Sequence, residues 1–396
     1  MPPTREPDRP SAPAPPHRGR GAASSPAGRF ERWVRVDEDD GWGDPSDERP
    51  APRTLVTWDT ARSVLSRNDS PDLPFDRSVN PYRGCEHGCV YCFARPSHAY
   101  LGLSPGLDFE TRIVAKPDAA RLLAHELARP GYAPAPLALG ANTDPYQPVE
   151  RRLGITRAVL EVLAASAHPV VVVTKSELVL RDLDLLAPMA ERGLVVVLVS
   201  LTTLAPELAG RLEPRAAAPH RRLAALRRLA DAGVPVGVLT APMIPGLNDH
   251  ELERLLAAGH AAGAESAGMV LLRLPHELGA LFDEWLAAHY PARRRRVLGL
   301  VRDCRDGTLN DPRFGSRMRG TGAYADLLAQ RFERAIARLG LSPRPRALET
   351  RHFRPPTPGP EARATAGAGA PPADQGAVAR GAPTRQLELF PGPRRG

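Results

Sequence analysis

The stretch "GCEHGCVYCFAR", residues 84 to 95, contains three of the four cysteines of the chain. Cys85, Cys89 and Cys92 follow the spacing C-x-x-x-C-x-x-C, and the fourth cysteine, Cys304, lies far downstream. Four cysteines in 396 residues, three of them clustered, do not make a disulfide framework. This pattern is more typical of a metal site or of catalysis in a reducing compartment.

Three thiolates are an unusual number for a structural zinc site, which takes four ligands and commonly draws them from C-x-x-C or C-x-x-H pairs. Only His87 or the distant Cys304 would complete such a set here. A [4Fe-4S] cluster is also held by thiolates, so three cysteines on one loop bind three irons and leave the fourth iron open. An open iron is a position for a reacting ligand.

Around the cysteines, short apolar runs alternate with amphipathic helical stretches. We expect strands just before the cysteines and at 136–140, 169–175, 193–201, 235–246 and 268–274. We expect helices at 118–128, 154–166, 181–193, 219–233, 249–263 and 277–289. Continuous apolar strands that alternate with helices predict a parallel sheet covered by helices on its outer face, with right-handed crossovers.

These repeating units predict an α/β fold, a partial (βα)6 TIM-like barrel with C-terminal helices. A doubly wound sheet is disfavoured, because no glycine-rich dinucleotide turn follows the first strand. The nearest match, "GTGAYA" at 320–325, has no strand before it and is read as a loop-helix junction. In such a barrel, chemistry gathers where the strands end.

The two ends of the chain are rich in Pro, Arg, Gly and Ser and poor in large apolar residues. Such segments cannot offset the entropy of ordering, so we expect disordered tails at 1–50 and 346–396. The folded unit, a barrel with a C-terminal helical extension, is then expected at 51–345.

The formal net charge is +8, which suits a nucleic-acid partner. Lysine occurs only at Lys116 and Lys175, so the charge is almost all arginine, which a GC-rich genome also produces. The run "RRRR" at 293–296 is expected to be the solvated face of a helix. No apolar run reaches the roughly 18 residues that span a bilayer, and no charged-then-apolar leader opens the chain, so we expect a cytoplasmic protein without a membrane partner.

The cysteine spacing, with the aromatic Tyr91 directly before the third cysteine, resembles the signature of the radical SAM superfamily. The resemblance implies that S-adenosylmethionine (SAM) chelates the open iron through its amino and carboxylate groups. It also implies an electron donor, and an electron from the reduced cluster that cleaves SAM to a 5'-deoxyadenosyl radical. Tyr91 and Phe93 would then pack near the cluster and the adenine.

Strand ends downstream strengthen the resemblance. "LGANTDPYQPVE" at 139–150 stands where the superfamily has Gly-Gly-Glu, and Gly140 matches in part. Asn142, Thr143 or backbone carbonyls of this segment are expected to take the methionyl amine. Lys175 ends the next strand and is expected to pair with the methionyl carboxylate as a compact charge. A capping or surface lysine is the alternative.

The ends of the fourth and fifth predicted strands are expected to bind the adenosine part of SAM. "VSLTT" ends the fourth strand, where Ser200 and Thr202 would bind the ribose hydroxyls. "PMIPGLND" at 242–249 is similar to the superfamily's G-x-I-x-G-x-x-E, and Ile244 would pack on the adenine.

"TDPYQPVE", "TKS" and "LEPRAAAPHRRL" (212–223) together resemble the branch related to spore photoproduct lyase. The branch implies a damaged pyrimidine dimer in DNA as substrate, a lyase-like reaction, and Arg215 among the residues that contact SAM. It also implies a further cysteine as hydrogen donor, yet none stands between the cluster motif and Cys304. Cys304 and Tyr146 are the candidates for that role, with a buried structural thiol as the alternative for Cys304.

A short apolar motif, "QLELF", stands in the C-terminal tail and resembles the peptide by which bacterial repair proteins dock on the sliding clamp. Gln386 would bond at the rim of the clamp pocket, and Leu389 and Phe390, preceded by Leu387, would enter it. Chance is a rival explanation for five residues.

The sequence therefore supports a radical SAM enzyme with a [4Fe-4S] cluster and SAM. It does not assign the substrate, for which the branch resemblance, the charge and the tail motif suggest a DNA lesion. The alternative is a non-catalytic, clamp-recruited, DNA-associated protein with a structural zinc or iron-sulfur site. A third hypothesis is a radical SAM enzyme that acts on RNA or on a protein.

Overall fold

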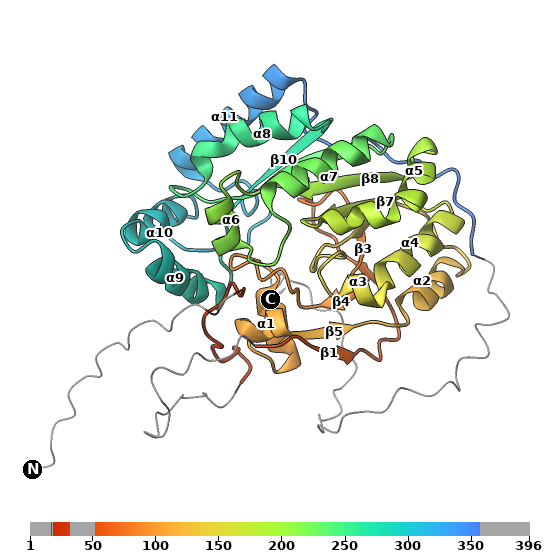
Figure 1. Ribbon diagram of the computed structural model, residues 1–396, viewed down its shortest axis with the longest axis horizontal. Helices are drawn as coiled ribbons and strands as arrows, with labels where there is room; N and C mark the ends of the chain where they lie inside the picture. The colour runs from red at the N-terminus through yellow and green to blue at the C-terminus, as the bar shows by residue number, and fades with distance from the viewer. Residues whose placement is uncertain (1–16, 18, 32–51, 357–396) are drawn as a thin grey trace, which may run out of the picture.

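The fold is built on one large sheet, seen in a computed structural model that describes residues 17, 19–31 and 52–356 (Figure 1). Its seven strands follow the order β10-β9-β8-β7-β6-β3-β2. They are β2 (Leu65–Arg67), β3 (Arg77–Val79), β6 (Leu137–Leu139), β7 (Val170–Thr174), β8 (Val195–Ser200), β9 (Val236–Met243) and β10 (Ser266–Leu271). All neighbours from β3 to β10 are parallel, and β2 is antiparallel to β3. The predicted partial barrel of six parallel strands is confirmed, with β2 as an added edge.

The central strands are valine-rich because both of their faces are covered. β7 pairs with β8 from Val170 opposite Val195 to Thr174 opposite Val199, and most of these side chains are buried. β-branched side chains suit such a pleated, packed surface. The core therefore lies on both faces of the sheet.

Helices cover the outer face of the sheet, as the amphipathic pattern predicts (Figure 1). They are α2 (Ala119–Leu127), α3 (Glu150–Leu153), α4 (Ile155–Ala165), α5 (Leu183–Glu191), α6 (Pro206–Leu212), α7 (Pro219–Asp231) and α8 (Leu252–Ala261), with the short 3-10 turns η2 (Glu177–Asp182) and η3 (Asp249–Glu251). Gly193, Gly233 and Gly263 follow three of the helices with positive φ angles of 67°, 77° and 95°. Glycine adopts this left-handed conformation readily and so ends the helices.

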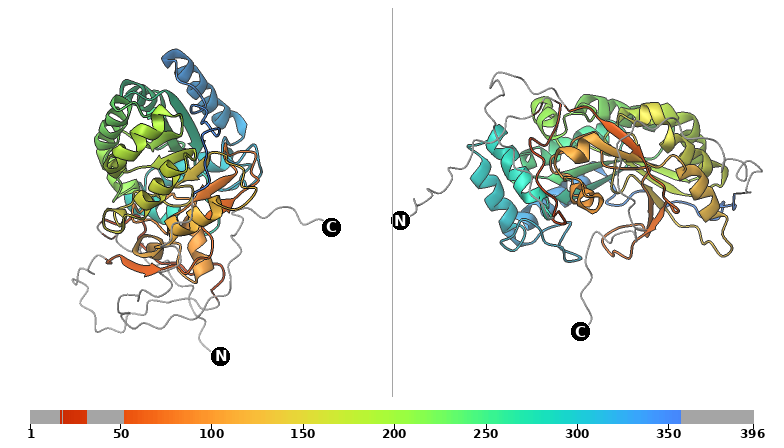
Figure 2. Two further views of the ribbon diagram at one scale, coloured as in Figure 1. Left: turned by 90° about the vertical axis from the view of Figure 1, so that its right-hand side faces the viewer. Right: turned by 90° about the horizontal axis from the view of Figure 1, so that it is seen from below.

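A second, three-stranded sheet lies beside the end of β3. Its order is β1-β5-β4, from β1 (Leu55–Trp58), β5 (Arg112–Ala115) and β4 (Tyr82–Arg83). η1 (Arg95–Leu101) and α1 (Leu107–Thr111) adjoin it, and Figure 2 shows this orange region from below. Because β4 follows β3 almost directly, the small sheet and the cysteine loop after it lie at the side where the parallel strands end, here called the carboxyl edge.

Three helices complete the described chain: α9 (Leu278–His289), α10 (Arg294–Asp303) and α11 (Gly322–Leu339). α11 packs on α8 at the top of Figure 1, and the stretch 320–325 forms the start of α11, as predicted. The arginines of 293–296 are exposed at the start of α10, which confirms the solvated helix face.

An ion pair, rather than a strand, connects the two edges of the sheet. The Nε of Arg317 lies 2.6 Å from the Oδ2 of Asp72, which follows β2. The carbonyl of Met318 accepts a 2.9 Å hydrogen bond from the amide of Leu271 at the end of β10. Segments that follow β2 and β10 are thereby joined across the open side of the barrel.

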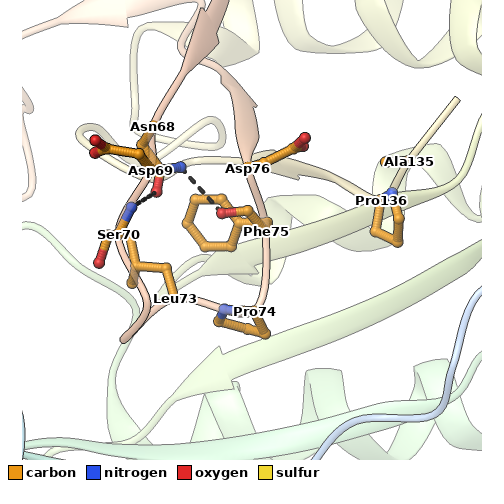
Figure 3. A pocket seen from close by; sticks show the side chains of 9 residues that line it. All are labelled: Asn68, Asp69, Ser70, Leu73, Pro74, Phe75, Asp76, Ala135 and Pro136. Atoms are coloured by element: carbon orange, nitrogen blue, oxygen red, sulfur yellow. Dashed lines mark hydrogen bonds between the residues drawn. The ribbon is translucent and has the colours of Figure 1, made fainter. Parts of the chain in front are cut away.

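The loop after β2 also lines a hollow of about 400 Å³ (Figure 3). Its wall consists of Asn68, Asp69, Ser70, Leu73, Pro74, Phe75, Asp76, Ala135 and Pro136. Asn68 donates a 3.0 Å hydrogen bond to the carbonyl of Phe75 and so holds the loop closed on itself. The hollow lies where β3 and β6 begin, which is the opposite end of the strands from the cysteine loop.

The folded unit extends beyond the predicted limits of 51 and 345. Residues 19–31 pack beside the cysteine loop, and the amide of Glu349 bonds the carbonyl of Gly193 at 2.9 Å. These segments dock by backbone hydrogen bonds and single side chains, which composition alone does not reveal, so the tail prediction is wrong for them. The "QLELF" motif lies outside the described residues, and its clamp role stays a prediction.

Among residues 19–31 and 52–356, no helix has both the length and the apolar character that crossing a membrane requires.

We predict that Phe353→Ala destabilises the fold by about 1–2 kcal/mol, less than a fully buried Phe because the ring is half-buried. Phe353 packs with centroid distances of 5.5 Å on both Tyr132 and His168. Urea unfolding measures the change. Leu327→Ala, at an exposed position of α11, is the control and should stay within about 0.5 kcal/mol of wild type. Equal effects of the two substitutions would contradict the docking of residues 346–356.

Candidate active site at the cysteine loop

The three cysteines lie on a tight loop between β4 and η1, and all three are free thiols. The amide of Cys85 donates a hydrogen bond to the carbonyl of Phe109 at 2.9 Å, and the amide of Cys92 donates one to the carbonyl of Cys89 at 3.2 Å. Cys85 and Cys89 are each 8% exposed, while Cys92 is half-buried. The loop therefore lies at the carboxyl edge with two buried thiols and with the Cys92 thiol partly exposed.

A buried ion pair holds the loop from behind. The Nε of Arg95 donates to the carbonyl of Cys89 at 2.8 Å, and one NH2 group donates to the carbonyl of Gly88 at 3.1 Å. The same guanidinium lies 2.5 Å from the carboxylate of Glu110, and neither side chain is exposed. Arg95 thus fixes the loop backbone while its charge is neutralised, which a buried ion requires.

The N-terminal segment completes this support. The amides of Gly21 and Ala22 donate to the Glu110 carboxylate at 2.9 and 2.8 Å, and Arg20 donates to the Glu110 carbonyl at 3.0 Å. A Cβ atom on Gly21 would lie 1.8 Å from the carbonyl oxygen of Gly88. Only glycine fits between the segment and the cysteine loop.

A second buried carboxylate, Asp144, joins three strand ends. Its Oδ2 lies 3.3 Å from the Nδ1 of His87 in the cysteine loop and accepts the amide of Lys175 at 2.7 Å. Its Oδ1 accepts the hydroxyl of Thr174 at 2.7 Å. Burial alone would raise the pKa of Asp144, but His87 and these hydrogen bonds outweigh burial and lower the pKa to about 2. The loop after β3, the end of β6 and the end of β7 are held together by this one charge.

The residues predicted to bind the methionyl amine lie at the end of β6. Gly140 has φ 97°, and a Cβ there would lie 2.6 Å from the carbonyl of Val173, so this position requires glycine for packing reasons. The hydroxyl of Thr143 donates to the carbonyl of Gly84 at 2.7 Å and is engaged in holding the cysteine loop. Asn142 bonds through its backbone amide, at 2.8 Å to Asn80 Oδ1, and its side chain is half-buried.

Lys175 brings a positive charge to the cysteine loop. Its Nζ lies 5.8 Å from the ring centroid of Tyr91. Burial would lower the pKa of Lys175, but the nearby Cys89 and Glu213 outweigh it and raise the pKa above its usual value. The ammonium group is therefore charged at neutral pH.

Glu213 is a buried carboxylate that the sequence analysis did not single out. It accepts hydrogen bonds from the hydroxyl of Tyr91 and from Arg222, and from the hydroxyl of Thr202 at 2.7 Å. Burial would raise the pKa of Glu213, but Arg222 and Lys175 lower it to about 2. Thr202 is thus committed to Glu213 and holds Tyr91 in place.

The other predicted SAM contacts surround the same loop. Ser200 is buried, and its carbonyl accepts a 3.1 Å hydrogen bond from Arg222. Ile244 is fully buried in the apolar cluster that includes Cys89. Arg215 lies 3.2 Å from the carboxylate of Glu86, within the cysteine motif.

Phe93 faces a different wall from Tyr91. The guanidinium carbon of Arg273, which follows β10, lies 4.8 Å from the Phe93 ring centroid. Tyr91 instead bonds Thr202, beyond the end of β8. Tyr91 therefore contacts the segment after β8, and Phe93 contacts the segment after β10.

The two candidate hydrogen donors are not brought to the cysteine loop. Cys304 is 1% exposed, ends α10 and packs in the cluster that includes Leu271 and Ala325, where burial raises its pKa to about 11. Tyr146 is fully buried, and its hydroxyl donates to Asp182 at 3.0 Å. Their positions favour structural roles.

The donor set fits an iron-sulfur cluster. Within the described part of the chain, no group of three or more His, Cys, Asp or Glu side chains is placed to hold a metal ion. Cys85 packs in the apolar cluster of Phe109, Cys89 packs in that of Tyr91, and Cys92 borders both clusters. Soft thiolate ligands within apolar walls suit iron-sulfur binding, and Lys175 and Arg222 offset negative charge beside Cys89.

Comparisons with known proteins agree with this site. Residues 79–258 match the family model of the radical SAM superfamily. An uncharacterized protein of Mycobacterium tuberculosis is 42% identical over 232 residues, which cover 58% of this chain and 68% of that protein. An uncharacterized protein of Methanocaldococcus jannaschii is 26% identical over 173 residues, covering 44% of this chain and 62% of that protein.

Solved structures of spore photoproduct lyase share the fold. A mutant with bound AdoMet and dinucleoside spore photoproduct superposes with a TM-score of 0.51 at 17% identity, covering 72% of this chain and 80% of that chain. A complex with dinucleoside spore photoproduct gives 0.50 at 18% identity, covering 72% and 81%. At this identity the likeness is one of fold.

We predict that Gly21→Ala weakens the support of the cysteine loop, because the new methyl group has no room beside the Gly88 carbonyl. The expected result is a loss of stability of about 1–3 kcal/mol and less iron retained after anaerobic reconstitution. Gly210→Ala on α6, where no atom lies within 4 Å of the added Cβ, is the matched control. If both variants keep wild-type stability and iron content, the N-terminal segment is not part of the site.

The lowered pKa of Glu213 predicts how the free energy of unfolding changes at acid pH. Its pKa is lowered from 4.5 to about 2, so its contribution is full above pH 4.5 and is lost as the pH falls through about 2. Glu213→Gln leaves Arg222 and Lys175 without this charge and should cost about 3 kcal/mol at pH 7 in the metal-free chain. The difference in the free energy of unfolding between wild type and Glu213→Gln should shrink as the pH falls from 4.5 to 2.

Urea unfolding across this pH range measures the gap. Glu207→Gln is the control, since Glu207 pairs with Arg211 on the exposed side of α6. A gap that stays constant with pH would contradict the lowered pKa of Glu213.

Proposed function

This chain belongs to the radical SAM superfamily, and on that basis we propose that Cys85, Cys89 and Cys92 hold a [4Fe-4S] cluster that binds SAM, and that the substrate is a DNA pyrimidine lesion. The chain is an enzyme of SAM-dependent radical chemistry. When bound, the cluster supplies the electron that cleaves SAM to methionine and a 5'-deoxyadenosyl radical. The single observation that carries the proposal is a loop of three thiols at the carboxyl edge of six parallel strands.

Lys175 is the residue that we assign to the methionyl carboxylate of SAM. Its ammonium group is charged, lies beside Tyr91 and is fixed at its backbone by Asp144. A rigid backbone and a flexible side chain allow a compact charge to reach a carboxylate at the loop. Asn142, at the adjacent strand end, is the side chain that we assign to the methionyl amine.

We propose that the adenosine part of SAM lies toward the ends of β8 and β9. Ser200 ends β8, and Ile244 directly follows β9 and packs with Cys89. Since Thr202 is bonded to Glu213, we assign ribose binding to Ser200 and a positioning role to Thr202 through Tyr91. The apolar wall around Cys89 excludes water from the side of the loop that faces the barrel.

The choice of DNA as substrate is supported by three features. The fold likeness to spore photoproduct lyase places the chain near a protein solved with a dinucleoside photoproduct. The net charge is +8, and two sequence motifs of that branch, "TDPYQPVE" and "TKS", lie at the ends of β6 and β7. No cysteine stands between Cys92 and Cys304 to serve as the hydrogen donor of that branch, so the product radical either meets a different fate or receives its hydrogen from another group.

We expect the anaerobically reconstituted, dithionite-reduced protein to convert SAM to 5'-deoxyadenosine and methionine, and UV-irradiated DNA to increase the rate above that with unirradiated DNA. Cys89→Ala should abolish cleavage because one thiolate of the set is lost. Cys304→Ala is the matched control and should retain cleavage, since this thiol packs in another cluster.

The outcomes separate the hypotheses. One zinc per chain with no iron would support a structural metal site and refute the enzyme. SAM cleavage that irradiated DNA leaves unchanged would refute the lesion substrate while leaving the radical chemistry in place, and stimulation by RNA or by a protein would identify the third hypothesis.

A further inference from the structure

Helix α10 carries a cluster of exposed arginines that none of the roles above uses. Arg295, Arg296 and Arg302 are exposed, and helical spacing places them on one side of α10. These three side chains are called the arginine face here. None of them forms an ion pair with another side chain that the structure describes, whereas the neighbouring Arg294 binds Asp283 at 2.5 Å. The arginine face therefore presents positive charge to the solvent.

The stability of the helix does not explain the arginine face. α10 has no acidic residue in its first turn and no side-chain hydrogen bond at its N-terminal cap. Cations near a helix N-terminus are unfavourable, because the backbone dipole is positive there. Arg302 stands in the last turn, where the dipole favours it, but Arg295 and Arg296 stand in the first turns. These two charges destabilise α10 unless an anion meets them.

The middle of the arginine face is open. Gly299 lies between Arg295 and Arg302, and no described atom outside the helix lies within 4 Å of a Cβ placed there. Packing therefore does not require glycine, although glycine inside a helix is less stable than alanine. Without a side chain at this position, the helix backbone is accessible to a partner that lies along the arginine face.

The opposite side of α10 packs at the carboxyl edge. It adds three buried residues to the apolar cluster that contains Cys89 and Tyr91: Val297, Leu298 and Val301. A Cβ on Gly246, in the loop after β9, would lie 3.0 Å from the Cδ1 of Leu300 in α10. Figure 1 shows α10 at the left margin of the molecule, next to α9. Because a helix is about 10 Å across, a nucleic acid on the arginine face lies within a few nucleotides' length of this cluster.

We propose that the arginine face binds the phosphate backbone of the nucleic-acid substrate, outside the segment that reaches the cysteine loop. Arg295 and Arg302 are about 10 Å apart along the helix, which matches the rise of about three nucleotides. Planar guanidinium groups bind phosphate oxygens through paired hydrogen bonds. This inference rests on the proposed nucleic-acid substrate and names the surface that binds its backbone.

A nucleic acid fits the arginine face better than a membrane does. Helices that lie on membranes insert large apolar residues beside their basic ones. In α10 the apolar residues instead face the barrel: Val297, Leu298 and Val301 are buried, and Leu300 lies against Gly246. The exposed side offers charge without an apolar anchor, which is what a phosphodiester backbone requires.

The first test measures binding of a fluorescent, unirradiated DNA duplex of about 20 base pairs to the reconstituted full-length protein, between about 50 and 200 mM salt. The triple variant Arg295→Gln, Arg296→Gln, Arg302→Gln should bind about tenfold more weakly at the lower salt concentration. Its slope of log affinity against log salt should be smaller by about 2 to 3, because about three phosphate contacts are lost. Urea unfolding should show no loss of stability, since these side chains are exposed.

A matched control removes the same charge from other helices. Arg152, Arg192 and Arg228 are exposed on α3, at the end of α5 and on α7. Replacing these three control arginines together by Gln should change the salt slope by less than about 1.

A second test uses the wild type alone, so it does not depend on the folding of a variant. Phenylglyoxal modifies accessible arginines, and mass spectrometry of the digested protein reports the extent at each position. The duplex should protect the arginine face from modification and leave the three control arginines reactive.

Equal salt slopes of the two triple variants, or equal modification of the two sets of arginines, would overturn the proposal. Displacement of the duplex by vesicles of phosphatidylserine and phosphatidylcholine would also overturn it and would identify a lipid surface instead. Failure of the proposed function is distinct, because it appears as absent SAM cleavage or as no stimulation by irradiated DNA, whereas duplex binding is measured with unirradiated DNA and without SAM.

Discussion

The site depends on buried carboxylates that fix the cysteine loop from different directions. Glu110 binds Arg95 behind the loop, Asp144 binds His87 within it, and Glu213 binds Tyr91 beside the third cysteine. A buried ion costs several kcal/mol unless its partners are well placed, so each of these acids specifies a partner and a distance. The loop conformation follows from these pairs rather than from the short backbone turns of the loop itself.

Charged side chains lie beside both aromatic residues of the cysteine motif. Near Tyr91, Lys175 and Arg222 lower the pKa of Glu213, so a buried carboxylate is balanced by buried cations. Near Phe93, the guanidinium of Arg273 lies over the aromatic ring. Each ring of the motif is thereby held against a different part of the barrel by polar or charged groups.

The fold followed from sequence because apolar periodicity and glycine positions are local signals. The strands at 170–174 and 195–200 and the helices α5 and α7 fell inside predicted ranges, whereas α6, which lies between β8 and α7, was not predicted. The acids of the site were harder, because their partners are distant: Arg95 binds Glu110, and Gly21 binds the same carboxylate from 89 residues away. Asp144 and Glu213 stood inside the quoted motifs "TDPYQPVE" and "LEPR". An acid followed directly by proline was the available signal, but only the structure shows the cations that justify its burial.

The open barrel explains why arginines gather at β10. A closed barrel fills its interior with side chains, whereas an incomplete one leaves a gap between its edge strands. Here an ion pair from Arg317 to Asp72 connects segments that follow the two edges, and Arg305 ties the carbonyls at the end of β10. Guanidinium groups can do this because each carries several donors and stays charged when buried. The edge of the barrel is thus closed by side chains that each reach several oxygen atoms, and no further strand is needed between β2 and β10.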